Sequence, residues 1–414
     1  MALRYGGAVL TDDATILGLL AATLGLVFYT AGSASPGWQK FYNYVPALLL
    51  CYFLPALYNT LGLIDGENSK LYFIASRYLL PATLVLLTLA INLPAIVRLG
   101  PKALTLFLAG TASVIVGAPL ALWVVGLMSP ETVGGEVWRG LTAVAGSWIG
   151  GGANQAAMKD VFDIPSDIFG AMVAVDVIVA NVWMAIVLYL AARSREIDTR
   201  RGVDTSAVDV LRDEVARFEK EHSRNPSLRD LMLICAAGFG LMGLSHLLGV
   251  PLARSIEAVA PQLGVYSLTS EFFWIVVLAT TFGLIASFTP ARNLEGAGAS
   301  KVGSVLLYVL VATIGMQMDL GAIVERPGLF AVGAVWMAFH ALVMFTVLHL
   351  LRAPLFFLGV GSMANIGGAA SAPVVAGAFH PALAPVGVLL AVLGYALGTY
   401  GGWLAGQLMR GIAG

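Results

Sequence analysis

The sequence predicts an all-α polytopic membrane protein made of two inverted structural repeats, and three observations lead to this prediction. First, 58% of the 414 residues are hydrophobic and 11% are charged, whereas a soluble domain carries about a quarter charged residues. Second, the apolar residues form runs long enough to cross a bilayer core. Third, the two halves of the chain are similar around two glycine-rich interruptions.

The apolar runs fall into six before and six after one polar stretch. We therefore expect a first membrane repeat in residues 1–192, a polar linker in 193–230 and a second membrane repeat in 231–414. Val208, Leu211, Val215 and Phe218 are spaced as on one face of a helix within the linker. This pattern predicts an amphipathic helix on the membrane or on the protein, or equally a solvated connector. The runs lie near residues 14–30, 42–61, 71–93, 103–127, 137–158, 168–192, 231–250, 271–288, 303–318, 329–351, 355–378 and 383–409.

The internal repeat is clearest where the glycines gather. The segment that starts IGGGANQAAMKD at Ile149 aligns without a gap to the segment that starts IGGAASAPVVAG at Ile366. Such paired glycine interruptions in two halves of a membrane protein point to the binding site of a secondary transporter. The expected breaks are residues 149–155 and 365–371.

Inverted halves require an odd number of membrane crossings in each half. We therefore expect residues 137–162 and 353–379 to form re-entrant hairpins with the glycines at their tips. The alternative is twelve true spans, of which two are merely unwound. Both arrangements place the arginine-rich linker in the cytoplasm. The hairpins would then leave both termini outside, and twelve spans would leave both inside.

The glycine-rich breaks are the predicted solute site. Glycine weakens a helix by about 1 kcal/mol relative to alanine. A broken helix exposes backbone N–H and C=O groups that bind anions and cations, respectively. Neighbouring amides add donors and acceptors. A small-residue packing interface is the alternative explanation for the glycines alone. The candidate residues are Gly150, Gly151, Gly152, Asn154, Gln155, Asn365, Gly367, Gly368 and Ser371.

Asp176 is the first candidate for a site that binds the coupling cation, either Na⁺ or a proton. It lies in the middle of the apolar run GAMVAVDVIVANVWMA, where a charged carboxylate costs at least about 2.5 kcal/mol. Its counterpart in the second half is Leu393, so the repeat is asymmetric at this position. Asn181 and Asn154 are the expected companion ligands, and a structural salt bridge or a neutral carboxyl group is the alternative. His340 is a weaker candidate for a proton relay.

Composition and motifs exclude several other classes. A formal net charge of −1 gives no basic surface for nucleic acid. The sequence holds neither the HExxH motif of a metalloprotease nor the phosphate-binding loop of an ATP-driven pump. We expect no enzymatic activity and no cofactor other than a bound Na⁺.

The stretch GSWIGGGANQAAMKDVFDIPSDIFGAMVAVDVIVANVW resembles the bacterial and plastid membrane family called domain of unknown function 819, and the resemblance extends over nearly the whole chain. That family is distantly similar to the superfamily of sodium/proton antiporters, bile-acid/sodium symporters and 2-hydroxycarboxylate transporters. This similarity implies a mobile core domain, a panel domain that often dimerises and elevator-type alternating access. The adjacent aspartate pair of the electrogenic antiporters is absent, because Val175 precedes Asp176, and this favours a sodium-coupled symporter.

The sequence therefore predicts a secondary active transporter of a small organic solute, including anions, coupled to Na⁺ or H⁺. The expected location is the bacterial inner membrane, and the expected partners are the solute, the coupling cation, membrane lipid and a second copy in a homodimer. A cation/proton antiporter is the alternative within transport. A non-transporting membrane scaffold or receptor, in which the linker helix binds a partner, is the alternative from another class.

Overall fold

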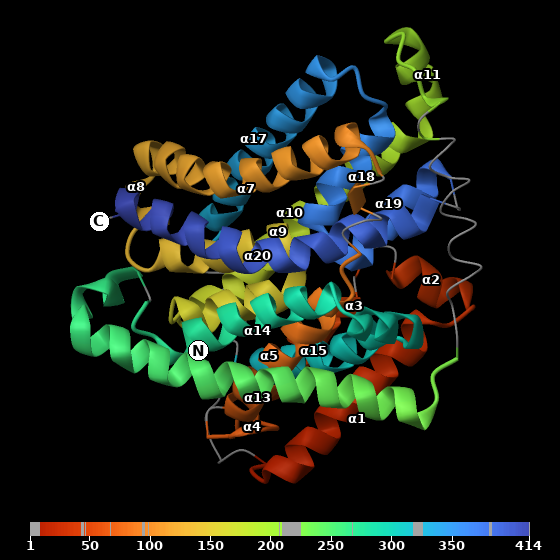
Figure 1. Ribbon diagram of the computed structural model, residues 1–414. Helices are drawn as coiled ribbons and strands as arrows, with labels where there is room; N and C mark the ends of the chain where they lie inside the picture. The colour runs from red at the N-terminus through yellow and green to blue at the C-terminus, as the bar shows by residue number, and fades with distance from the viewer. Residues whose placement is uncertain are drawn as a thin grey trace.

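The computed structural model is a bundle of helices (Figure 1). It describes residues 9–42, 45, 47–66, 68–92, 96–97, 99–206, 208, 225–266, 268–317, 326–380 and 383–413. Most of the expected amphipathic linker helix lies outside these residues. The elements are α1 (Asp13–Ala31), α2 (Pro36–Tyr42), α3 (Ala47–Thr60), α4 (Leu71–Ile74), the π-helix η1 (Ala75–Leu79), α5 (Leu80–Leu89), α7 (Pro101–Met128), α8 (Pro130–Val133), α9 (Val137–Val161), α10 (Ser166–Ala192), α11 (Ser194–Arg200), α13 (Leu228–Val259), the 3-10 helix η2 (Pro261–Tyr266), α14 (Glu271–Ser287), the 3-10 helix η3 (Pro290–Ala297), α15 (Ala299–Gly315), α17 (Gly328–Leu350), α18 (Leu355–Ile366), α19 (Gly368–Phe379) and α20 (Ala384–Ala413).

The helices agree with a protein that spans a membrane several times. Seven described helices are long and apolar enough to cross a bilayer, and up to nine if each of two sharply bent helix pairs is one span. α9 is not one of these seven helices, although the sequence analysis placed an apolar run there. Its glycines, Asn154, Gln155 and Lys159 lower its hydropathy, so its length alone does not make it a span.

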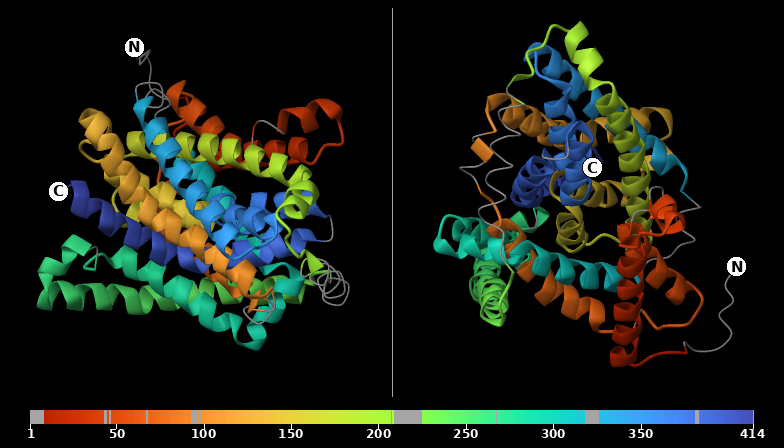
Figure 2. Two further views of the ribbon diagram at one scale, coloured as in Figure 1. Left: turned by 90° about the horizontal axis from the view of Figure 1, so that it is seen from above. Right: turned by 90° about the vertical axis from the view of Figure 1, so that its right-hand side faces the viewer.

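The helices form two groups that each draw on both halves of the chain. In the first, which we call the α5 group, α5 packs against α13, α14 and α15, and α3 packs against α1 and α15. In the second, the α9 group, α9 packs against α7, α10, α18 and α20, and α7 packs against α17 and α18. The α5 group lies below the α9 group in Figure 1 and in the right-hand view of Figure 2. The interface between the groups is made mainly by α5, α14 and α15 against α9 and α20.

α9 reverses direction in its middle. Gly150 and Gly151 have non-helical backbone angles, with φ −136° and 73°. The rings of Trp138 and Phe162, at opposite ends of the segment, have centroids only 6.1 Å apart. A straight helix rising roughly 1.5 Å per residue would separate them by about 36 Å. α9 is therefore a hairpin, with a first arm before Gly150 and a second arm after Gly151.

α18 and α19 form a second hairpin. Their boundary falls at Gly367 and Gly368, and Gly368 has a φ of 56°. The rings of Phe356 and Phe379, at the far ends of the two helices, have centroids 5.5 Å apart. Helix α10 shows how the two hairpins are oriented. It starts beside the base of the first hairpin, and α11 directly after its end contacts the start of α18. The hairpin bases therefore lie at opposite ends of α10.

The two hairpin tips meet. A Cβ atom added to Gly368 would lie 3.7 Å from the Cα of Gly151. Helix α20 packs closely against the first tip, because a Cβ on Gly398 would lie 2.6 Å from the Cα of Gly150 and one on Gly394 2.5 Å from the carbonyl oxygen of Ile149. Glycines thus serve both as helix breaks and as packing contacts. A broken helix and a small-residue packing interface, the two explanations offered for the glycines, are therefore compatible.

The tip conformation gives a first prediction. Gly151 combines φ 73° with ψ −174°, a region that is essentially restricted to glycine and costs other residues about 1–3 kcal/mol. Gly151→Ala should lower the free energy of unfolding by this amount, measured by thermal or denaturant unfolding of the purified protein in detergent. Gly18→Ala is the matched control, because Gly18 lies inside α1 with nothing within 4 Å of an added Cβ. An equal stability of the two variants would contradict the tip geometry.

Candidate functional site

Asp176 is the centre of a buried polar cluster. Its side chain lies on α10 and is 6% exposed. Oδ1 accepts a hydrogen bond from Trp148 Nε1 at 2.7 Å, and Oδ2 accepts from Ser147 Oγ at 2.7 Å and from Gln155 Nε2 at 2.8 Å. The carboxylate is thus bound by three neutral donors.

These three donors come from both arms of the first hairpin. Ser147 and Trp148 precede the break and Gln155 follows it. A carboxylate is an acceptor with about four lone-pair sites, so one side chain on α10 can hold both arms at once. Tyr52 of α3 extends the cluster into the α5 group, because its hydroxyl donates to Gln155 Oε1 at 3.2 Å.

Asn154 anchors the first tip to α20. Its Nδ2 donates to the carbonyl oxygens of Gly150 and Tyr395, both at 2.9 Å. Its Oδ1 accepts from Thr399 Oγ1 at 2.6 Å. Thr399 in turn bonds to Thr280 of α14 at 3.0 Å. The amide thus satisfies one backbone carbonyl that the break leaves free and connects the tip to both helix groups.

Asn365 does the same for the second tip. Its Nδ2 donates to the carbonyl oxygens of Phe107 at 3.0 Å and Gly361 at 2.9 Å, and its Oδ1 accepts from Thr111 Oγ1 at 2.8 Å. Each tip therefore has an asparagine that bonds to the carbonyl four residues before it and to a neighbouring helix. Both asparagines are fully buried.

At the tips, Gly151, Gly152, Gly367 and Ser371 are only partly buried. A Cβ on Gly152 would meet nothing nearer than Leu307 of α15 at 4.0 Å. A helix break leaves N–H groups at the start of the following arm and C=O groups at the end of the preceding arm without intrahelical partners. These four residues are the partly exposed part of the predicted solute site, whereas Gly150 and Gly368 are buried.

The structure joins most, but not all, of the candidate residues. Gly150 to Gln155 and Asn365 to Ser371 meet at the tips, and Asp176 binds Gln155 directly. Asn181 is different, because its Nδ2 donates to the Val177 carbonyl of its own helix at 2.7 Å and no described contact joins it to Asp176. Among the described residues, no group of three or more His, Cys, Asp and Glu could hold a metal ion. The roles of these residues toward a solute or cation stay predictions.

Several side chains of the site gave no recognisable signal in the sequence. The donors Ser147 and Trp148 and the anchors Thr111 and Thr399 are ordinary residues of apolar runs. Ser147 and Trp148 precede the break by only a few positions, so their closeness to it was the one available signal. Thr111 and Thr399 reach the tips from distant helices, and only the tertiary structure reveals them.

His340 is the middle of a buried chain of hydrogen bonds that joins four helices. Ser113 Oγ and Ser362 Oγ lie 2.7 Å from Nδ1 and Nε2, respectively, and Trp183 Nε1 donates to Ser362 Oγ at 2.7 Å. Ser113 also donates to the Gly110 carbonyl at 2.6 Å. A neutral imidazole protonated on Nδ1 satisfies all of these groups. This complete set of partners favours a structural role for His340 over a proton relay.

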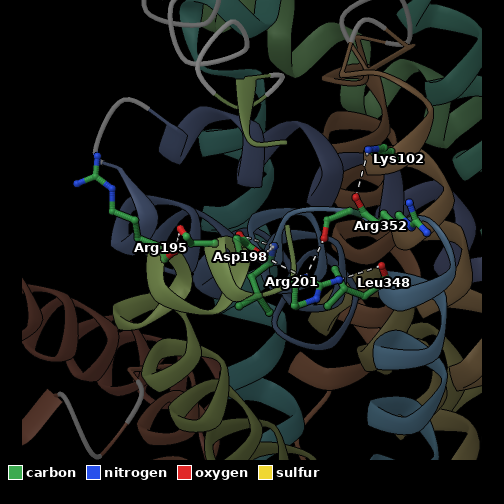
Figure 3. A network of polar contacts seen from close by, with 9 residues as sticks. Lys102, Arg195, Asp198, Arg201, Leu348 and Arg352 are labelled. Carbon is green, nitrogen blue, oxygen red and sulfur yellow. Dashed lines mark hydrogen bonds and ion pairs between the residues drawn. The ribbon is translucent and has the colours of Figure 1, made fainter. Parts of the chain in front are cut away.

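The start of the polar linker closes the base of the second hairpin (Figure 3). Asp198 of α11 accepts from the backbone N–H of Leu355, the first residue of α18, at 3.1 Å and 3.2 Å. Arg201 donates to the carbonyl oxygens of Leu348 at 3.3 Å and Ala353 at 3.1 Å and pairs with Asp198 at 3.1 Å. The carboxylate thus lies at a helix N-terminus and the guanidinium at the C-terminal end of α17, where each suits the helix dipole.

Burial raises the pKa of Asp198, while the Leu355 N–H and Arg201 oppose the rise. The side chain of Asp198 is 6% exposed and that of Arg201 is 22% exposed, so the carboxylate of the ion pair has little contact with solvent. The linker is therefore not wholly a solvated connector, because its first turns are bound to the core.

The sequence matches the family described as "Protein of unknown function (DUF819)" over residues 18–412, and the chain belongs to this family. It is also similar to the "Uncharacterized membrane protein YjcL" of Bacillus subtilis (strain 168), with 25% identity over 361 residues. This alignment covers 85% of the chain and 86% of the relative. The resemblance to the family is thereby confirmed, and the protein is an integral membrane protein.

The Asp176 cluster predicts a specific rescue. Asp176→Asn places an N–H donor where Oδ2 accepts two bonds, which should cost about 1–3 kcal/mol of unfolding free energy. Adding Gln155→Glu restores an acceptor opposite the new donor and still accepts from Tyr52. The double variant should recover part of the lost stability in thermal unfolding. A double variant that is less stable than either single variant would contradict the contact.

The linker clamp predicts a second stability change. Asp198→Ala removes the acceptor for the Leu355 N–H and should lower the unfolding free energy by about 0.5–2 kcal/mol, as loss of a helix N-cap does. Glu196→Ala is the matched control, because the ion pair of Glu196 with Arg200 on the same helix is exposed, and such pairs contribute little. Denaturant unfolding of both variants checks this, and an equal loss would show that α11 does not hold α18.

Proposed function

We propose that the protein is a secondary active transporter that moves a small organic solute by alternating access and performs no chemical conversion. The observation that carries the proposal is the meeting of two glycine-tipped hairpins from the two halves of the chain. In hydrocarbon, non-helical backbone is tolerated only where protein buries it or where it lines a cavity. Transporters use such discontinuous helices to bind solute at the middle of the membrane.

The proposed topology follows from the linker. If the arginine-rich linker is cytoplasmic, the second hairpin enters from the cytoplasm and the first from the opposite side. Both hairpins are then re-entrant, and the two halves of the chain are inverted repeats. The solute would bind between the tips, at Gly150, Gly151, Gly152, Gly367, Gly368 and Ser371, while Asn154 and Asn365 hold the tips in place.

The two helix groups support an elevator-type movement. In this proposal the α9 group carries the hairpins past the α5 group. The polar contacts of the hairpin region across the interface are made by hydroxyl groups, such as Tyr52 on Gln155 and Thr280 on Thr399. Single hydrogen bonds of this kind contribute about 1 kcal/mol each, so they can break and re-form during transport. The proposal also includes a homodimer within membrane lipid in the bacterial inner membrane.

The coupling ion is the proton or Na⁺, and the donors around Asp176 favour the proton. Na⁺ requires several oxygen ligands, whereas the groups that face this carboxylate are N–H and O–H donors. A proton on Asp176 would remove the charge of the carboxylate and so weaken its three charge-assisted hydrogen bonds to the hairpin arms. Protonation would thereby loosen the first hairpin, and this links ion binding to the conformation of the tip.

Uptake into proteoliposomes tests the proposal. A panel of radiolabelled amino acids, carboxylates and sugars is offered under an imposed proton gradient or an imposed Na⁺ gradient. At least one compound should accumulate when a gradient is present, and Asp176→Asn should abolish its accumulation. Asp167→Asn is the matched control, because Asp167 lies on the same helix in a partly exposed ion pair with Arg326. The absence of gradient-driven uptake for every compound would contradict transport.

Thermal stability in Na⁺ and in K⁺ separates the two ions. A ligand at a hundred times its dissociation constant stabilises a protein by about 2.7 kcal/mol. Proton coupling predicts equal stability in the two salts at constant pH, for the wild type and for Asp176→Asn. A rise in thermal stability that is specific for Na⁺ and absent from Asp176→Asn would identify a sodium site and contradict proton coupling.

A further inference from the structure

A second buried polar cluster lies at the base of the first hairpin, on the interface between the two helix groups. Lys159 is on the second arm, one turn beyond Gln155, and is 6% exposed. Its Nζ donates to Tyr72 Oη of α4 at 3.2 Å, and Tyr72 Oη donates to Asp160 Oδ1 at 2.7 Å. Tyr72 therefore bridges two groups of opposite charge.

Neither charged group is fully satisfied. An ammonium group has three donors, and within the described residues Lys159 makes one hydrogen bond. Its other contacts are with the faces of two rings, at 4.3 Å from the centroid of Tyr72 and 5.8 Å from that of Phe169. Asp160 Oδ2 is buried without a hydrogen-bond partner. Unpaired buried charges are costly, so both groups have capacity for a ligand.

The backbone beside this cluster is also unusual. Helix α4, which carries Tyr72, runs at Ala75 into the π-helix η1, a rare element that often occurs at functional sites. Arg77 lies in η1, with its guanidinium 4.3 Å from the centroid of the Phe272 ring. The carbonyl oxygen of Arg77 lies 2.8 Å from His246 Nε2. The π-helix thus lies within one turn of Tyr72, and the Arg77 guanidinium is a second positive charge that acts on Asp160.

We infer that Lys159, Tyr72 and Asp160 form a subsite for a zwitterionic solute of the amino-acid class. The solute carboxylate binds the free N–H groups of Lys159, and its ammonium group binds Asp160 Oδ2. A purely anionic solute would bind Lys159 but would face the unpaired oxygen of Asp160. A purely cationic solute would face the ammonium of Lys159. Only a solute with both charges satisfies both groups.

The place of the cluster suits an access route to the tips. Gln155 and Lys159 are four residues apart and lie on one face of the second arm, so the subsite leads along this arm toward Asp176 and Gly151. At the tips, the ends of the half-helices again present both N–H and C=O groups, which suit a zwitterion as well. This inference rests on the proposed function, because it names the class of solute that the transporter takes.

Thermal unfolding of the purified full chain in detergent tests the subsite. The common L-amino acids are added one at a time, and for each that stabilises, its amide and its 2-hydroxy acid are compared with it. At least one amino acid should raise the midpoint by a few degrees, while the amide, which lacks the carboxylate, and the hydroxy acid, which lacks the ammonium group, should not. If the hydroxy acid or the amide stabilises the protein as much as the amino acid does, the inference that the solute is a zwitterion is overturned.

Two variants assign the effect to this cluster. Lys159→Met and Asp160→Asn should weaken the apparent affinity for the amino acid by about thirtyfold or more, because each leaves one charge of the solute unpaired. Lys70→Met is the matched control, since Lys70 is exposed beside α4. Size-exclusion profiles establish that each variant is folded. Unchanged affinity in both variants would overturn the subsite.

The outcomes remain distinct from those of the uptake experiment. If no amino acid stabilises the wild type while a carboxylate or a sugar is accumulated under a gradient, the inference about the solute class fails and the transporter stands. If no compound is accumulated under any gradient while amino acids still bind at Lys159, the proposed function fails and the subsite stands.

Discussion

The carboxylate of Asp176 is the interaction on which the first hairpin depends. A chain that reverses inside an apolar bundle leaves backbone groups without helical partners. Its two arms are joined covalently only at the tip, so other contacts must hold them side by side. Trp148 and Ser147 on one arm and Gln155 on the other all donate to this single side chain. The cost of placing a charge in an apolar bundle is offset by these three bonds, and removal of any donor weakens the connection between the arms.

The two tips use the same solution with different partners. Asn154 bonds to the carbonyl of Gly150 and to α20, and Asn365 bonds to the carbonyl of Gly361 and to α7. An asparagine amide is both donor and acceptor, so one side chain can donate to a backbone carbonyl of its own hairpin and accept from a threonine. The carboxylate has no equivalent at the second tip, and this asymmetry gives the first hairpin a titratable group that the second lacks.

Buried charged groups occur at both hairpin bases and beside the first tip. Asp198 and Arg201 hold α18 at the end of the bundle where the polar linker begins. Lys159 and Asp160 lie at the base of the other hairpin, on the interface between the helix groups. Asp176 lies between these two ends and is surrounded by neutral donors. Polar groups therefore occur at both hairpin bases and at the tips.

The sequence by itself determined the class of protein, the positions of the helices and the place of the breaks. Hydrophobic runs and glycines are local signals. A run of apolar residues must be buried in lipid or protein, and three consecutive glycines have a low helix propensity. Asp176 was recognisable because a carboxylate in an apolar run is costly wherever the run folds. The tertiary structure alone decided that the chain reverses at Gly151, that Gly368 meets it there, and that Asn154 and Asn365 turn toward the protein as anchors. It also decided that Asn181 turns away from Asp176 and that Tyr72 lies between Lys159 and Asp160. These features depend on contacts between residues far apart in the chain, and local periodicity carries no information about which distant side chain satisfies a given donor.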